Sequence, residues 1–214
     1  MKYNTYLFDF DGTLVDSMST FASVMLRILD ENKIGYGDDI IKIITPLGCV
    51  GTARYFIERL GLPMSQMQVL ELMYRYMYDE YANRIPSKPQ VIDTLNRLKE
   101  MGASLHILTA SPHVTLDVCL KRLGIYDVFE NVWSCDDFNM TKADVEIYRR
   151  AAEKIGVTIA EILFLDDNYN AVSTAANAGM STCGVFDETS REYIKEIKAT
   201  ANHYIYDFSE ILTL

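Results

Sequence analysis

Residues 5–13 read TYLFDFDGT, an apolar run that ends in two acidic residues and a glycine. The run Thr5 to Phe10 is short and apolar, which predicts a buried strand, and Asp11-Gly12-Thr13 ends it as a turn. An ionised Asp9 at the end of an apolar strand is costly without a partner. The stretch therefore predicts a strand that carries a functional carboxylate, although Asp and Gly are also common in purely structural turns.

Downstream, the chain consists of a helical insertion followed by alternating helices and strands. Residues 16–85 show helical periodicity only, and Ser65 with Gln68 predicts a capping box. We interpret the Met and Tyr residues at 67–81 as packing within this insertion, and which of the Tyr residues, if any, face a substrate is left open. After Pro89, strands are predicted at 104–108, 132–134, 162–165, 181–186 and 203–207, with helices between them. This order predicts an α/β fold with a doubly wound, mostly parallel sheet.

Composition narrows the function classes. The chain has 214 residues, enough for one good core and a smaller lobe, and a formal net charge of −10 without a basic cluster. We therefore expect no nucleic-acid partner. We also expect no membrane partner, since no apolar run approaches the roughly 18 to 20 residues that cross a bilayer. Scattered cysteines and a start without secretory features favour a cytoplasmic location.

Polar residues follow several of the predicted strands. Doubly wound sheets bind ligands outside the carboxyl ends of their strands, so these residues are the candidate site. They are Asp9 and Asp11, Thr109 and Ser111, and Asp166 and Asp167, with Lys142 in a loop on the same edge. Four carboxylates together would repel each other unless a cation lay among them, and oxygen ligands of this kind suit Mg²⁺. The predicted metal ligands are Asp9, Asp11, Asp166 and Asp167.

A metal-held carboxylate beside a bound phosphate is placed for nucleophilic attack, so Asp9 is the candidate nucleophile and would form an aspartyl-phosphate. Asp11 could protonate the leaving oxygen and then activate water. Thr109 would hold the phosphoryl oxygens, and Lys142 would offset negative charge in the transition state. The predicted substrate contacts are Gly12, Thr13, Thr109, Ala110 and Lys142. Taken alone, Lys142 would more often be a solvated surface lysine, and Thr109 could be only a buried hydroxyl at a strand end. Ser111 is interpreted as a helix cap before Pro112.

These segments resemble the motifs of the haloacid dehalogenase superfamily. Residues 9–13 are similar to its first motif, DxDGT, and residues 105–109 to its second, a hydrophobic strand ending in Thr or Ser. Lys142 sits where the family keeps its lysine, and residues 162–168 resemble its metal-binding motif. The resemblance covers nearly the whole chain. It implies a Rossmann-like core at 1–15 and 86–214, an all-helical C1-type cap at 16–85, Mg²⁺ dependence, and a metal contact from the Asp11 backbone carbonyl.

Two segments depart from the family pattern. Residues 141–145 read TKADV where many relatives have GKPxP, and Asp166 and Ala171 replace the first and last residues of GDxxxD. We expect Asp167 to be a direct ligand and Asp166 a second one, direct or through water. The alternative is that both only cap the next helix.

The expected function is a phosphatase acting on a small phosphorylated metabolite, in the phosphoglycolate phosphatase-like or β-phosphoglucomutase-like branch. Asp11 argues against dehalogenase chemistry, because dehalogenases of the family lack this second Asp. A hexose-phosphate mutase is the nearest rival, although Phe21 stands where such mutases carry a histidine. A receiver domain would lack the helical insertion, and a non-catalytic relative stays open. The substrate, the cap contacts (Arg54, Arg59 and Arg75 are candidates) and the oligomeric state stay open too.

Overall fold

The computed structural model describes residues 2–214, which form two compact units. The core unit comprises the chain up to Asp16 together with Pro86–Leu214, and the helical unit comprises Ser17–Ile85. Each unit has its own apolar core. Among the described residues, no helix combines the length and the apolar character needed to cross a bilayer.

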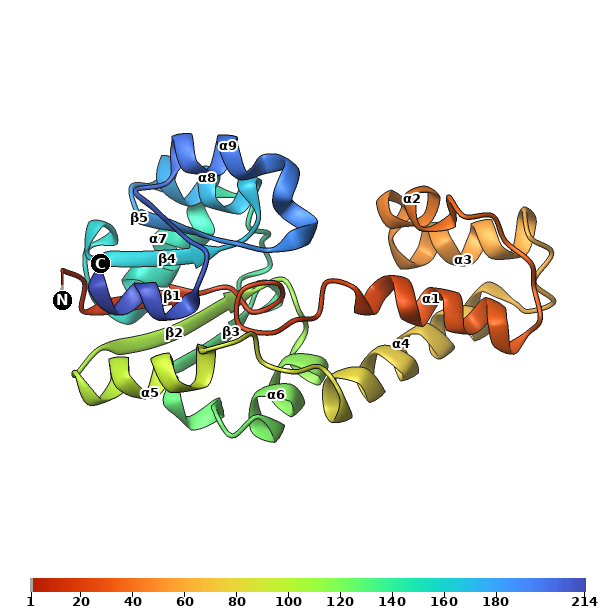
Figure 1. Ribbon diagram of the computed structural model, residues 1–214, viewed down its shortest axis with the longest axis horizontal. Coiled ribbons are helices and arrows are strands. Elements are labelled where there is room, and N and C mark those ends of the chain that lie inside the picture. The colour runs from red at the N-terminus through yellow and green to blue at the C-terminus, as the bar shows by residue number, and fades with distance from the viewer. Residues whose placement is uncertain (1) are drawn as a thin grey trace. The chain divides into compact units, whose positions relative to one another are not determined.

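Six parallel strands form the sheet of the core unit, in the order β3-β2-β1-β4-β5-β6. They are β1 (Thr5–Phe8), β2 (Ser104–Thr109), β3 (Asn131–Ser134), β4 (Ile162–Asp166), β5 (Ser181–Val185) and β6 (His203–Ile205). Figure 1 shows β1 between β2 and β4. The strand order reverses between β1 and β4, which is where a doubly wound sheet opens a ligand crevice. The predicted α/β fold class is confirmed.

Helices cover both faces of this sheet. They are α5 (Val91–Glu100), α6 (His113–Arg122), α7 (Val145–Ile155), α8 (Tyr169–Ala178) and α9 (Ile194–Thr200). Figure 1 shows α8 and α9 on one side of the sheet and α5 on the other. Side chains alternate along β1: Leu7 packs in a buried cluster with Tyr148 of α7, while the Phe8 ring packs against Phe129 and Phe208. β1 is thus buried on both faces, as a central parallel strand must be.

Short 3₁₀ helices occur in both units. The helical unit contains η1 (Thr45–Leu47), and the core unit contains η2 (Tyr126–Val128), η3 (Cys135–Phe138), η4 (Ile159–Glu161), η5 (Glu188–Tyr193) and η6 (Phe208–Thr213). The helix predicted at about 190–199 is therefore divided, since η5 occupies its first residues and α9 the rest. Pro112 precedes α6 as its N-cap residue, and no side chain caps that helix. The interpretation of Ser111 as a helix cap is wrong.

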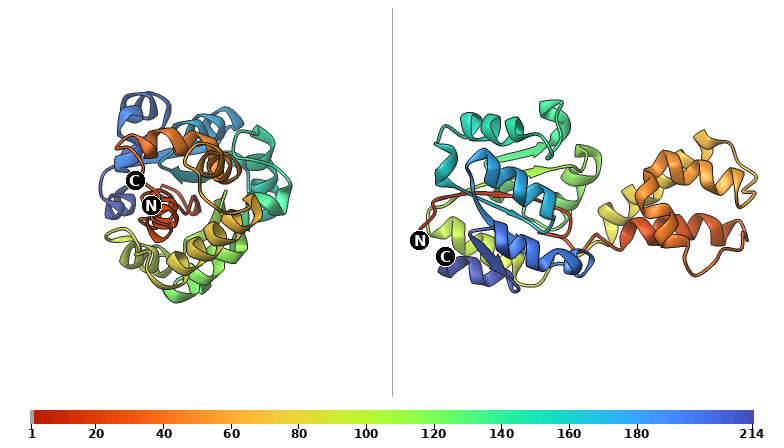
Figure 2. Two further views of the ribbon diagram at one scale, coloured as in Figure 1. Left: turned by 90° about the vertical axis from the view of Figure 1, so that its right-hand side faces the viewer. Right: turned by 90° about the horizontal axis from the view of Figure 1, so that it is seen from above.

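The helical unit contains α1 (Thr20–Glu31), α2 (Ile40–Ile44), α3 (Gly48–Glu58) and α4 (Gln66–Asn83), drawn in red to yellow in Figure 2. Its core is apolar and draws on all four helices, with Met25, Ile44, Phe56 and Met73 as members. The Ser65 side chain accepts from the Gln68 backbone N–H, and the Gln68 side chain accepts from the Ser65 N–H, so the predicted capping box is confirmed.

The Met and Tyr residues of α4 divide between two environments. Met73 and Tyr76 are buried, whereas Met67 and Tyr74 are 71% and 61% exposed. Packing within the insertion was the wrong interpretation for these last two residues. Tyr76 is held by contacts inside the helical unit, because its hydroxyl donates to Glu31 and the Arg27 guanidinium lies 4.0 Å from the centre of its ring.

Candidate active site

The sheet places the predicted site residues at the carboxyl ends of β1, β2 and β4. Asp9 directly follows β1, and Asp166 is the last residue of β4. The two strands are in register with Phe8 opposite Leu165, and the Asp9 N–H donates to the Leu165 carbonyl at 2.8 Å. Asp9 and Asp166 therefore lie on either side of the point where the strand order reverses.

Three buried carboxylates gather at this point. One oxygen each from Asp9, Asp166 and Asp167 lies within 4.8 Å of the others. Burial raises the pKa of Asp9 to about 7, against the lowering effect of Lys142, and repulsion from Asp166 and Asp11 adds to the increase. Burial also raises the pKa of Asp167, as do Asp166 and Asp9. Three acids of this kind repel each other and favour the binding of a cation.

Lys142 supplies one positive charge to this group. Its ammonium donates to Asp9 and, at 2.7 Å, to Asp166, and its side chain is 14% exposed. Burial lowers the pKa of Lys142, but Asp166 and Asp9 outweigh this effect and raise it, so the ammonium stays charged. The Tyr148 hydroxyl lies 3.0 Å from the Lys142 carbonyl oxygen and fixes the loop. Lys142 is thus a buried ion-pair partner, and the alternative of a surface lysine is wrong.

The two adjacent acids of the metal-binding motif differ in how fully they are bonded. Asp166 accepts from the Asn168 N–H at 2.7 Å and from Lys142, so both its oxygens have close donors. Asp167 has a longer contact, 3.4 Å from the Thr13 hydroxyl. Asn168, not either acid, caps α8, so the alternative that they are only helix caps is wrong for this helix. The Asp167 carboxylate therefore has more lone pairs left to coordinate a metal than the Asp166 carboxylate.

The donor set fits Mg²⁺. This ion binds hard oxygen ligands and commonly takes one or two carboxylates from the protein, with substrate oxygens and water completing its shell. Asp9 and Asp167 offer such oxygens, and Asp166 is close enough to act directly or through water. When all three carboxylates are ionised, one ammonium does not balance them, and a divalent cation would neutralise the remaining negative charge. The Asp11 carboxylate is not a member of this group.

Asp11 instead turns toward the end of β2. Its Oδ2 accepts from the Ser111 hydroxyl, and the Ser111 N–H donates to the Thr109 hydroxyl oxygen at 3.1 Å. The Thr109 O–H proton thus remains available to another acceptor. The structure therefore brings Asp11 and Thr109 together through Ser111, which sequence reasoning had given a different role. Ala110 lies between them and is exposed.

Gly12 and Thr13 shape the turn that carries Asp11. The Gly12 N–H donates to the Val15 carbonyl at 3.0 Å, and Thr13 is fully buried with its hydroxyl on Asp167. Gly12 has φ +79°, and a Cβ built there would lie 2.8 Å from the Asp167 carboxylate. The backbone at Gly12 thus passes directly against a candidate metal ligand. Substrate contact by Gly12, Thr13 and Ala110 stays a prediction.

Replacing Gly12 by Ala tests this close approach. The Gly12→Ala variant should lose about 2–4 kcal/mol of unfolding free energy, because the left-handed backbone costs about 1–2 kcal/mol and the Cβ displaces Asp167. Gly102→Ala is the matched control: Gly102 has φ +85° but nothing within 4 Å of its Cβ position. Urea unfolding of both variants measures the difference, and equal losses would contradict a clash with Asp167.

Sequence reasoning missed an ion pair behind this turn. The Lys88 ammonium donates to the Gly12 carbonyl at 2.6 Å, to the Phe186 carbonyl at 2.7 Å and to Asp187 Oδ2 at 2.9 Å. Asp187 is buried; burial alone would raise its pKa, but hydrogen bonds from Thr189 and Lys88 lower it. No sequence motif identifies Lys88 or Asp187, because their contacts join segments that are 76 to 99 residues apart in the chain.

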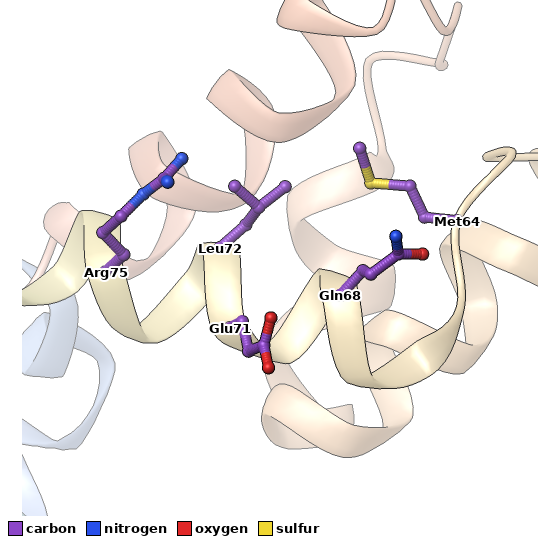
Figure 3. Close-up of a pocket in the computed structure, with 5 residues that line it drawn as sticks. All are labelled: Met64, Gln68, Glu71, Leu72 and Arg75. Atoms are coloured by element: carbon purple, nitrogen blue, oxygen red, sulfur yellow. The ribbon is translucent and has the colours of Figure 1, made fainter.

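The helical unit has a hollow of its own, about 400 Å³ in volume, along α4 (Figure 3). It is lined by Met64, Gln68, Glu71, Leu72 and Arg75. In Figure 3 the Arg75 and Leu72 side chains point to one side of the helix and Glu71 to the other. Of the three arginines named as candidate substrate contacts, Arg75 is the one that borders this hollow.

Comparison with known proteins gives the same family as the motifs. The family model described as haloacid dehalogenase-like hydrolase matches residues 6–185. The pyrophosphatase PpaX of Bacillus velezensis is 30% identical over 187 residues, which is 86% of this chain and 83% of that protein.

Solved structures share the fold at lower identity. The hydrolase YfnB from Bacillus subtilis, whose structure was solved bound to magnesium, has a TM-score of 0.79 at 18% identity and covers 100% of this chain and 98% of its own. CbbY from Rhodobacter sphaeroides, solved in complex with xylulose-1,5-bisphosphate, has a TM-score of 0.76 at 17% identity, covering 97% and 96%. At these identities the likeness concerns the fold.

Proposed function

Because this chain belongs to the haloacid dehalogenase-like hydrolases, we propose that it is a Mg²⁺-dependent phosphatase that hydrolyses a small phosphorylated metabolite. The observation that carries the proposal is the position of Asp9, which lies at the carboxyl end of the central strand beside Lys142, Asp166 and Asp167. A carboxylate held there faces the crevice side of the sheet, where a phosphate would bind. We assign the role of a cap to the helical unit.

In the first step, a carboxylate oxygen of Asp9 attacks phosphorus, a phosphorus–oxygen bond forms, and the bond to the leaving oxygen breaks. Asp11 donates its proton to that oxygen and becomes a carboxylate. In the second step, Asp11 takes a proton from water, and the resulting hydroxide attacks phosphorus. The bond to Asp9 breaks, inorganic phosphate is released, and Asp11 is again protonated.

Other side chains stabilise the charge that develops on the phosphoryl group. The Lys142 ammonium, which donates to Asp9, offsets this negative charge. The Thr109 O–H donates to a phosphoryl oxygen. Mg²⁺ held by Asp9, Asp167 and, directly or through water, Asp166 would supply further positive charge at the phosphate oxygens. The predicted metal contact of Asp11 is its backbone carbonyl, which leaves its carboxylate, oriented by Ser111, for proton transfer.

Inorganic pyrophosphate is the second candidate substrate. The observation that favours it is the similarity to the pyrophosphatase PpaX of Bacillus velezensis, which is 30% identical over 86% of this chain. Pyrophosphate would undergo the same attack by Asp9, with inorganic phosphate as the leaving group. Both substrates would thus use the same nucleophile, although inorganic phosphate is a less basic leaving group than an alkyl oxygen and needs less protonation by Asp11.

Phosphate release from a panel of substrates tests this function. Pyrophosphate, phosphoglycolate, hexose phosphates and nucleoside monophosphates are incubated with the full chain, with and without Mg²⁺. We expect metal-dependent release, and the substrate with the highest kcat/KM identifies the class. Absence of release from every compound would contradict the phosphatase proposal. Interconversion of hexose 1- and 6-phosphates without release would favour a mutase.

Binding of Mg²⁺ should release protons. The raised pKa of Asp9, about 7, means that this carboxyl is partly protonated at neutral pH, and Mg²⁺ binds only the ionised form. We expect proton release at pH 7, less of it at pH 8.5, and a weaker apparent affinity below pH 6. Calorimetric titration in two buffers of different ionisation enthalpy measures the number of protons. An affinity independent of pH between 6 and 8.5 would contradict this assignment of ligands.

A further inference from the structure

A buried cation lies directly behind the turn that carries Asp11. Lys88 follows Pro86, the first residue after the helical unit, and its side chain is 17% exposed. Its ammonium uses all three protons, on the Gly12 carbonyl, the Phe186 carbonyl and Asp187. An ammonium that is fully bonded within the protein has no donor left for a substrate. Lys88 therefore makes no hydrogen bond to a substrate, and its contact with the site is through its partners.

One of these partners lies between the two parts of the proposed site. Gly12 is bonded in the chain to Asp11, and its backbone lies against the Asp167 carboxylate. The Lys88 backbone reinforces the contact, because its N–H donates to the Leu14 carbonyl at 2.9 Å and Ser87 forms an antiparallel bridge with Val15. A shift of the Gly12 carbonyl would therefore move Asp11 and press on Asp167.

The counter-ion explains why the ammonium stays in this position. Asp187 Oδ2 accepts from Lys88, while Asp187 Oδ1 accepts from the Thr189 N–H at 2.9 Å and its hydroxyl at 2.6 Å. The Asp187 side chain is only 7% exposed. A carboxylate buried in this way requires its cation, since an unpaired buried charge is strongly destabilising. The pair thus joins the segment after β5 to the Asp11 turn.

We propose that Lys88 is a positioning residue, paired with Asp187, that holds the Asp11 turn in its productive place through the Gly12 carbonyl. This inference rests on the proposed phosphatase function. A displacement of about 1 Å in a catalytic group can cost about 100-fold in rate. The loss should appear in kcat and not in KM, because Lys88 makes no contact with substrate in this arrangement.

The first test compares Lys88→Met with Lys99→Met. Lys99 also pairs with an acid in the core unit, Glu130 at 3.3 Å, but both side chains are 44% to 49% exposed. We expect Lys88→Met to lower kcat about 10- to 100-fold with KM within about threefold of wild type. Lys99→Met should keep both constants. A kcat for Lys88→Met within about twofold of wild type would overturn the inference.

A second test separates positioning from a general loss of stability. Lys88 borders a cavity of about 190 Å³ that Thr13 and Phe186 also line. The Lys88→Ala substitution removes three methylene groups and the ammonium, and so enlarges this cavity. Added propylammonium has the same number of carbons and an ammonium, and should restore the cation and raise kcat, whereas 1-propanol should not. If urea unfolding shows the variant folded and propylammonium does not raise kcat, the inference is wrong.

Hydrogen exchange gives a measurement that does not depend on turnover. Three backbone hydrogen bonds close the turn: Gly12 N–H to Val15, and Leu14 and Val15 N–H to Phe10. Exchange in a peptide spanning 9–17 should be faster in Lys88→Met and unchanged in Lys99→Met, and equal exchange would overturn the inference. If wild type itself releases no phosphate, the proposed function fails, and the exchange result still shows whether Lys88 holds the turn.

Discussion

Replacement of Asp9 by Asn should abolish phosphate release, with kcat reduced by about 10⁴-fold or more. An amide oxygen in place of the carboxylate cannot attack phosphorus, so the aspartyl-phosphate does not form. The shape of the side chain is kept, and the amide can still accept from Lys142, which now donates to Asp9. The loss should therefore appear in the rate of the first step, measured by rapid-quench detection of phosphorylated protein.

The same substitution should reduce the dependence of stability on pH. The pKa of Asp9 is raised from 3.8 to about 7 in the folded protein, so the native state binds more protons than the unfolded state between these values. Stability conferred by that protonation is lost as pH rises toward 7. In metal-free urea unfolding, wild type should therefore lose more stability than Asp9→Asn between pH 5 and 8.

Asp93→Asn is the matched control for both experiments. Asp93 lies in the first turn of α5 and is exposed, so the same chemical change there should leave turnover and pH dependence unaltered. Near-wild-type turnover in Asp9→Asn would exclude Asp9 as the nucleophile. A steeper pH dependence in the variant would contradict the proposed cause of the raised pKa, which is burial among other acids.

Local sequence signals were sufficient for the fold because each has a short-range physical basis. The apolar run before Asp9 becomes β1, and the capping box of Ser65 and Gln68 opens α4. The alternation of strands and helices predicted a parallel sheet, because a strand–helix–strand connection within one sheet normally joins parallel strands. The order of the strands was not predicted. Boundaries were less predictable: the strand predicted to Phe10 ends at Phe8. The Asp9 N–H still donates to the Leu165 carbonyl of β4, but the Phe10 carbonyl accepts from Leu14 and Val15 and so belongs to the turn.

Some residues of the candidate site could be predicted from the sequence and others could not. Asp9, Asp166, Asp167 and Lys142 were predictable, because strand ends in a parallel sheet converge and the motifs mark which ends matter. Ser111 was misinterpreted because a serine before proline is a common helix start, whereas its hydroxyl is bonded to Asp11, 100 residues away. Lys88 and Asp187 carry no motif. Contacts between residues so far apart in the chain depend on tertiary packing, which the pattern of apolar residues in the sequence does not reveal.

Asp11→Asn should separate the two chemical steps. The amide can still accept from the Ser111 hydroxyl, so the turn should keep its geometry, but it cannot exchange a proton with the leaving group or with water. We expect turnover of an alkyl phosphate to fall by about 10²–10⁴-fold. An aryl phosphate with a weakly basic leaving group needs little protonation, so its first step should be affected much less.

Hydrolysis of the aspartyl-phosphate still requires a base to activate water, whatever the leaving group. Asp11→Asn should therefore release nitrophenol from 4-nitrophenyl phosphate in a burst that matches the enzyme concentration, followed by slow turnover, and phosphorylated protein should accumulate. Acid quench followed by mass spectrometry measures that species on Asp9. If alkyl and aryl phosphates lose rate equally and no phosphorylated protein appears, Asp11 is not the acid and base. Its effect would then lie in the geometry of the turn, which Ser111→Ala would reproduce by removing the hydroxyl that orients it.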